Sequence, residues 1–134
     1  MLEELALPDW MDGCVKGRSA HSNANVHRNQ RNLAKVDVKR FFPSVTHRMV
    51  YAAFVRAGFG PEPARLLTRI ATRGGHLPQG APTSDRLANL HLATAALALE
   101  AIFQTHDLKA SAYVDDIAFS GEETRQAIPK VIPL

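Results

Sequence analysis

Two adjacent acids inside a short apolar stretch constrain the fold of this chain more than any other feature. Asp115 and Asp116 lie between the apolar segments 112–114 and 117–119. Two short apolar segments that flank a polar pair are typical of a β-hairpin. We therefore predict a hairpin over residues 111–120, with Asp115 and Asp116 at its tip.

A second strand is predicted over residues 33–38. Apolar residues recur there with a period of two, and Lys35 and Asp37 take the alternate positions. Successive side chains of a strand point to opposite faces, so one face should be buried while Asp37 projects from the other. The apolar positions are Ala34, Val36 and Val38.

Helices are predicted between and before these strands. Thr46 can cap a helix that runs to about Ala57, and Gly58 follows where a C-terminal cap belongs. Pro61 opens a second helix, because proline is favoured in the first turn. Its predicted apolar stripe, before Gly74-Gly75 stops it, is Leu66, Leu67, Ile70 and Ala71.

A longer helix is predicted from Thr83 or Ser84 to about Thr105. Its leucines leave little polar face, so we expect it to be largely buried. Residues 1–12 are expected to form either a short helix or an extended arm, and a short helix is expected from Ser19 to about Arg28. Residues 121–134 start like a turn and a helix, which Pro129 and Pro133 should break.

These elements predict an α+β fold with an antiparallel sheet covered on one face by helices. The 134 residues are 46% hydrophobic and 22% charged, as in ordinary globular domains. The single cysteine, Cys14, excludes an internal disulfide and a multi-cysteine zinc site, and makes a reducing, cytoplasmic compartment the expectation. We see no run of the roughly 18–20 apolar residues that a membrane span needs, so no membrane partner is expected.

Charge is distributed unevenly along the chain. Residues 13–73 hold 12 Lys or Arg against two acids, whereas the remainder holds four basic and 11 acidic residues. A basic segment of this size fits a phosphate-rich partner, with nucleic acid as the first candidate. A solvated basic surface that keeps the protein soluble explains the charge equally well.

Carboxylates on two neighbouring strands would repel each other unless a cation neutralises them. Hard oxygen ligands suit Mg²⁺, and Asp37, Asp115 and Asp116 could hold two such ions for in-line phosphoryl transfer. From the acidic pair alone a plain turn is the better interpretation, because Asp is common in turns.

Three segments favour the metal site over a plain turn, because in their order and spacing they together resemble a reverse transcriptase. Residues 35–42, with Asp37 before hydrophobic and aromatic residues, resemble the first aspartate motif. Residues 77–84 resemble the loop-to-helix motif that shapes the nucleotide pocket, and residues 113–116 resemble the YxDD hairpin. The resemblance implies the core of a right-hand polymerase palm.

The subfamily resembles bacterial retron and retron-like enzymes, because residues 23–27 fit their NAxxH element. Val114 departs from the alanine usual in such enzymes, and Asp85 replaces a frequent proline. The resemblance covers about residues 13–121. It implies three parts, namely an N-terminal arm with partial fingers (1–32), a palm core (33–121) and a truncated tail (122–134) without a primer grip or thumb.

The resemblance also implies roles for individual residues. Asp37, Asp115 and Asp116 would be the catalytic, metal-binding acids, with two Mg²⁺ ions or with Mn²⁺. Phe42 matches the steric gate that favours deoxynucleotides, although core packing explains one of Phe41 and Phe42. The remaining nucleotide-binding candidates are Val38, Arg40, Phe41, Gln79 and Gly80, and the nucleic-acid contacts are Lys16, Arg18, Arg28, Arg31 and Lys39.

The activity implied is RNA-directed DNA synthesis on an RNA template, with a DNA or RNA primer, dNTP substrates and a cognate structured non-coding RNA. Phage defence is an expectation from the family. Two alternatives stay open, namely an inactive fragment that retains weak nucleic-acid binding and another palm polymerase that uses RNA templates. The expected absence of a thumb predicts that these 134 residues do not carry out processive synthesis.

Overall fold

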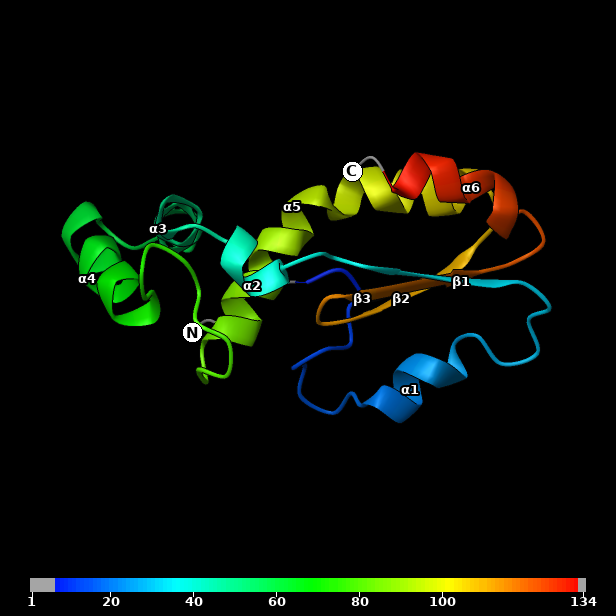
Figure 1. Ribbon diagram of the computed structural model, residues 1–134, viewed down its shortest axis with the longest axis horizontal. Helices are drawn as coiled ribbons and strands as arrows, with labels where there is room; N and C mark the ends of the chain where they lie inside the picture. Colours follow the sequence, from blue (N-terminus) through cyan, green and yellow to red (C-terminus); the bar gives the residue numbers. More distant parts are fainter. Residues whose placement is uncertain (1–6, 133–134) are drawn as a thin grey trace. The chain divides into compact units, whose positions relative to one another are not determined.

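The computed structural model describes residues 7–132, which divide between two compact units (Figure 1). One unit contains residues 40–92, and the other combines residues 8–39 with residues 93–132. The long helix α5, Ser84–Thr105, begins in the first unit and ends in the second. The division into an arm, a palm core and a tail stays a prediction.

The second unit is built on a three-stranded antiparallel sheet with the order β1-β3-β2. Its strands are β1 (Leu33–Asp37), β2 (Lys109–Tyr113) and β3 (Asp116–Ser120). The predicted α+β class, the antiparallel sheet and the hairpin are confirmed. Burial alternates along β1 as its sequence predicts, with Asp37 exposed and Val36 half-buried.

The register of the hairpin corrects the predicted tip. Tyr113 pairs with Asp116, so the two turn residues are Val114 and Asp115, and Asp116 is the first residue of β3. Val114 has φ of 60°, in the left-handed region that β-branched residues avoid. A two-residue hairpin turn needs positive φ at its first central position, and this geometry outweighs the preference of valine.

Helices lie on both sides of this sheet rather than on the single face expected. Phe103 of α5 packs on Phe119 of β3 with ring centroids 5.6 Å apart, on the apolar face. Helix α6 (Thr124–Val131) lies on that side as well, whereas α1 (Ala20–Asn25) lies on the other (Figure 1). The polar face is therefore the one that meets α1.

His27 connects the segment after α1 to the polar face of the hairpin. Its Nδ1 lies 2.6 Å from Ser120 Oγ, and its Nε2 lies 2.8 Å from Ser111 Oγ. Both serines are almost completely buried. The histidine of the NAxxH element thus gives two buried hydroxyl groups their hydrogen-bond partner, one from each arm of the hairpin.

The segment before α1 continues the sheet beyond β2. The N–H of Ala112 donates to the Trp10 carbonyl at 2.7 Å, and the Ala112 carbonyl accepts from Asp12 N–H at 2.7 Å. Met11 and Ala112 form a parallel bridge. An extended arm was one of two forms expected for residues 1–12, of which residues 1–6 lie outside the described residues.

Gly13 ends this arm directly against the turn of the hairpin. A Cβ atom on Gly13 would lie 2.3 Å from the backbone nitrogen of Val114. No side chain fits at that distance, so the arm approaches the strained turn only because residue 13 is glycine.

The first unit is helical, with α2 (Phe41–Ser44), α3 (His47–Arg56), α4 (Pro61–Ala71) and the first part of α5. The predicted cap at Thr46 is confirmed, since its side chain accepts from Met49 N–H. Gly58, with φ of 91°, follows the end of α3 as expected.

The predicted apolar stripe of α4 is wrong for two of its members. Leu66 and Ile70 are 59% and 75% exposed, whereas Ala64, Thr68 and Ala71 are buried. The helix turns its small side chains inward, and the Thr68 hydroxyl donates to the Ala64 carbonyl at 2.6 Å. The size of the side chains determines which face of α4 packs closely, and a hydropathy pattern alone does not show which face that is.

The expectation that α5 is largely buried is also wrong in part. Leu87, Leu92, Leu99 and Phe103 are buried, but Leu97 is 79% exposed. Among the described residues, α5 is the one helix long and apolar enough to cross a membrane, with 39% of its most apolar stretch buried. Core helices of water-soluble proteins meet the same criterion, so this is weak support for a membrane role.

Helix α6 continues through Pro129, which was expected to break it. Proline removes the hydrogen bond that residue 129 would give to the Arg125 carbonyl. Both residues are exposed, so water can satisfy that carbonyl. The buried positions Thr124, Ala127 and Val131 hold the helix in place. Pro133 lies outside the described residues.

Replacing Gly13 by Ala should lower the free energy of unfolding by about 1–3 kcal/mol, because the arm must move away from Val114. Gly60→Ala is the matched control, since its Cβ would meet only Pro63 Cδ at 3.9 Å. Urea unfolding measures both variants. Equal decreases in the free energy of unfolding for the two variants would contradict the close approach of Gly13 to Val114.

Acid should destabilise the fold through His27. Burial lowers the pKa of His27 below its usual value of 6.5, and the nearby Lys109 lowers it further. The folded state thus favours the neutral ring, so its contribution is complete above pH 6.5 and is lost as pH falls through the lowered pKa. Urea unfolding measures the free energy of unfolding at pH 7.5 and at pH 5.0. The decrease between these two pH values should be smaller for His27→Gln than for the unaltered chain, and equal decreases would exclude this role.

Candidate functional site

Asp37 and Asp116 lie directly opposite each other where β1 pairs with β3. Residues in such a pair project from the same face, with Cβ atoms about 4.5–5.5 Å apart. Asp37 is exposed and Asp116 is half-buried. The register therefore brings together two of the three acids that the sequence singled out.

Asp115, the third acid, lies in the turn beside this pair. Its backbone carbonyl accepts from the Val38 N–H at 3.0 Å, one residue beyond the end of β1. This hydrogen bond fixes the turn to the end of β1. The backbone of Asp115 is thus placed next to the Asp37–Asp116 pair by both neighbouring strands.

Lys35 forms an ion pair with one of these acids. Its Nζ lies 2.8 Å from Asp116 Oδ2. The pKa of the Lys35 ammonium is raised, mainly by its hydrogen bond to Asp116 and also by the charges of Asp116, Asp37 and Asp115. Lys35 was placed on the face of Asp37 from the sequence, but its role as a partner of the acids was missed.

The donor set fits a magnesium ion held by few protein ligands. Among residues 7–132, no group of three or more His, Cys, Asp or Glu side chains is close enough together to form a metal site. Mg²⁺ commonly binds through one or two carboxylates and takes its other ligands from substrate phosphates and water. The opposed pair Asp37 and Asp116 satisfies that requirement, and a preassembled three-carboxylate site is not needed for it.

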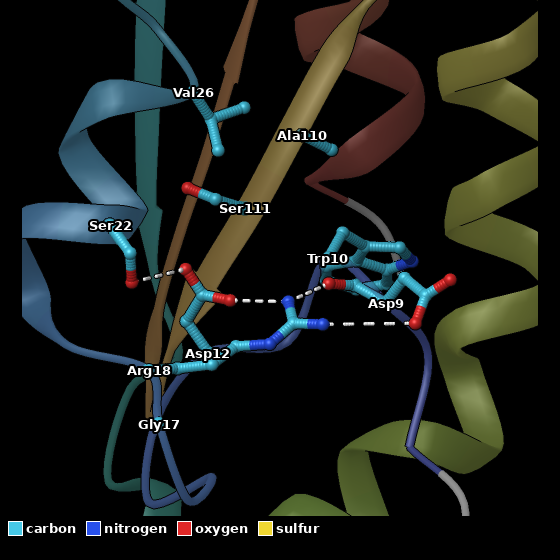
Figure 2. Close-up of a pocket in the computed structure, with 9 residues that line it drawn as sticks. All are labelled: Asp9, Trp10, Asp12, Gly17, Arg18, Ser22, Val26, Ala110 and Ser111. Atoms are coloured by element: carbon cyan, nitrogen blue, oxygen red, sulfur yellow. Dashed lines mark hydrogen bonds and ion pairs between the residues drawn. The ribbon is translucent and has the colours of Figure 1, made fainter.

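A cavity of about 540 Å³ lies between the arm, α1 and β2 (Figure 2). Arg18 reaches across it, and its Nη1 donates to Asp12 Oδ1 at 2.6 Å and to the Asp9 carbonyl. Asp12 is buried, and Ser22 Oγ lies 3.5 Å from its other carboxylate oxygen. The guanidinium of Arg18 therefore connects two residues of the arm, Asp9 and Asp12.

The other four predicted nucleic-acid contacts belong to the same unit as the acids and have exposed side chains. They are Lys16, Arg28, Arg31 and Lys39. Arg18 differs from them because it is paired with Asp12.

The predicted nucleotide-binding residues are divided between the units, with Val38 in the unit that holds the sheet. In the helical unit, Phe41 is 4% exposed and packs edge-on against the half-buried Phe42. Arg40 has φ of 55° at the start of α2. Gln79 and Gly80 are exposed in the loop before α5, where Gly80 has φ of 84°.

No family model matches the chain. Nearly its whole length is nevertheless similar to retron reverse transcriptases. It is 28% identical to the retron Ec86 reverse transcriptase of Escherichia coli over 96% of the chain. It is 29% identical to the retron Se72 reverse transcriptase of Salmonella heidelberg over 92%, and 30% identical to the retron Mx162 reverse transcriptase of Myxococcus xanthus over 97%.

The aligned regions cover 40%, 33% and 30% of these three relatives, so the chain spans between about a third and two fifths of their length. Relatives from three bacteria agree in name and in the extent of the match. The chain is therefore similar, over nearly its whole length, to a segment of retron reverse transcriptases.

Proposed function

We propose that the chain is the palm segment of an RNA-directed DNA polymerase and that it carries the polymerase's catalytic acids. The observation that supports this most is the opposition of Asp37 and Asp116, with Asp115 in the adjoining turn. Isolated turn acids have no reason to be paired in this way, because like charges opposite each other destabilise a sheet. A role in holding cations explains why the sheet keeps two like charges opposite each other although they destabilise it.

In this proposal Asp37 and Asp116 hold Mg²⁺ through their carboxylates, and Asp115 contributes from the turn. Bound Mg²⁺ would lower the pKa of the attacking primer hydroxyl and stabilise the charge that develops on the leaving pyrophosphate. The sheet positions the three acids, because the pairing of β1 with β3 and the Val38–Asp115 hydrogen bond fix their backbone.

We propose that the nucleotide-binding residues predicted from the sequence select and orient the nucleotide. The backbone carbonyl of Val38 serves the metal, and the amides of Arg40 and Phe41 face the triphosphate. Phe42 excludes a ribose 2′-hydroxyl, and its partial exposure leaves ring surface for that contact, whereas Phe41 is committed to packing. Gln79 borders the sugar and the templating base, and the lack of a Cβ at Gly80 lets the backbone come close.

The partners in this proposal are an RNA template, a DNA or RNA primer, dNTPs and a structured non-coding RNA, in the bacterial cytoplasm. Lys16, Arg28, Arg31 and Lys39 contact the phosphate backbone, which makes binding sensitive to salt and blind to sequence. Arg18 contributes indirectly, because its guanidinium holds the arm through Asp12.

Replacing Asp116 by Asn should reduce Mg²⁺-dependent addition of a single dNTP to a DNA primer on an RNA template by at least about a hundredfold. The chain is assayed at primer–template concentrations that saturate binding. Asp107→Asn is the matched control, because Asp107 is an exposed acid with φ of 48°, a conformation that Asn also tolerates.

Unchanged addition by Asp116→Asn would contradict the assignment of the acids. Duplex binding by the unaltered chain without any nucleotide addition would favour the alternative, a nucleic-acid-binding segment that does not catalyse by itself.

A further inference from the structure

We infer that Lys35 is a built-in counter-ion of the carboxylate pair, which must leave Asp116 before a divalent cation is held there. This inference rests on the proposed function, because it concerns the same carboxylates. It adds a positioning residue that controls how strongly the site takes a metal ion.

The placement of Lys35 follows from the sheet register. Lys35 precedes Asp37 by two residues on β1, so the two side chains project from the same face. The residue opposite Lys35 is Ala118, whose small side chain leaves the lysine stem free to extend. Asp116 is the diagonal neighbour of Lys35, at a distance that long side chains can span.

The ammonium and a metal ion would compete for the same oxygen atom. Lys35 Nζ lies 2.8 Å from Asp116 Oδ2, which therefore already accepts a charged hydrogen bond. Mg²⁺ binds carboxylate oxygens at about 2.0–2.1 Å, so both cations cannot share Oδ2 without strong repulsion. Metal binding through Oδ2 thus requires that Lys35 turn away.

Exposure makes this exchange feasible. The side chains of Lys35 and Asp116 are 61% and 41% exposed, and exposed ion pairs are weak because water and salt screen them. A lysine also carries its charge on a flexible stem, so it can withdraw without moving the backbone. The same residue that offsets the repulsion between Asp37 and Asp116 is therefore displaceable.

Manganese binding tests this inference without relying on activity. Free Mn²⁺ is measured by electron paramagnetic resonance during titration of the chain at low ionic strength, with no nucleotide present. Lys35→Met should bind Mn²⁺ about two- to fivefold more tightly than the unaltered chain, which corresponds to the weak pair that it removes. Lys35→Gln, which keeps a polar side chain, should show the same tightening.

Lys109→Met is the matched control. Lys109 lies on the same polar face, opposite Ser120 and four residues along β3 from Asp116. Removing its charge should leave Mn²⁺ affinity nearly unchanged. An equal tightening in this control, or no tightening in both Lys35 variants, would overturn the counter-ion role.

Asp116→Asn separates this inference from the proposed function. If it weakens Mn²⁺ binding while the Lys35 variants behave like the unaltered chain, the metal site stands and only the counter-ion role fails. If it leaves Mn²⁺ binding unchanged, or if no form of the chain binds Mn²⁺ measurably, the proposed metal site fails and the inference fails with it.

Discussion

Two like charges held opposite each other on neighbouring strands are the constraint on which the rest of the site depends. The ladder pairs Asp37 with Asp116, and the backbones of the two acids cannot separate without breaking the pairing of β1 with β3. Like-charged cross-strand pairs are destabilising, so the sheet retains them at a cost. Lys35 offsets part of that cost in the structure, and a divalent cation would offset it in the proposed reaction.

Much of the second unit serves to hold the hairpin that carries two of the acids. Ala112 is paired with the arm on one side of the hairpin, and His27 connects its two serines on the polar face. The turn itself is strained, since Val114 has positive φ and lies against Gly13. Strain of this kind persists only where the surroundings determine the backbone, and it is concentrated at functional sites.

Local signals in the sequence predict local structure well. Thr46 caps its helix and Asp37 lies on the exposed face of its strand because both features depend on neighbours in the chain. The register that makes Asp116 the first residue of β3, and not a turn residue, depends on pairing between strands, and period-two alternation does not determine it. Burial of the small face of α4 instead of Ile70 likewise follows from close packing, which a hydropathy pattern cannot show. The ion pair of Lys35 was beyond sequence reasoning for the same reason, since its partner is on another strand.

The stability of Asp37→Asn with and without magnesium separates the repulsion between Asp37 and Asp116 from their proposed role in holding a cation. In EDTA the variant should be as stable as the unaltered chain or up to about 1 kcal/mol more stable, because one of two opposed charges is gone. Added Mg²⁺ should raise the unfolding free energy of the unaltered chain but not that of the variant, because a cation that binds only the folded state stabilises it. Urea unfolding in both buffers gives the four values. A variant that is less stable in EDTA, or an unaltered chain whose stability does not respond to Mg²⁺, would contradict the view that this pair of acids is kept to hold a cation.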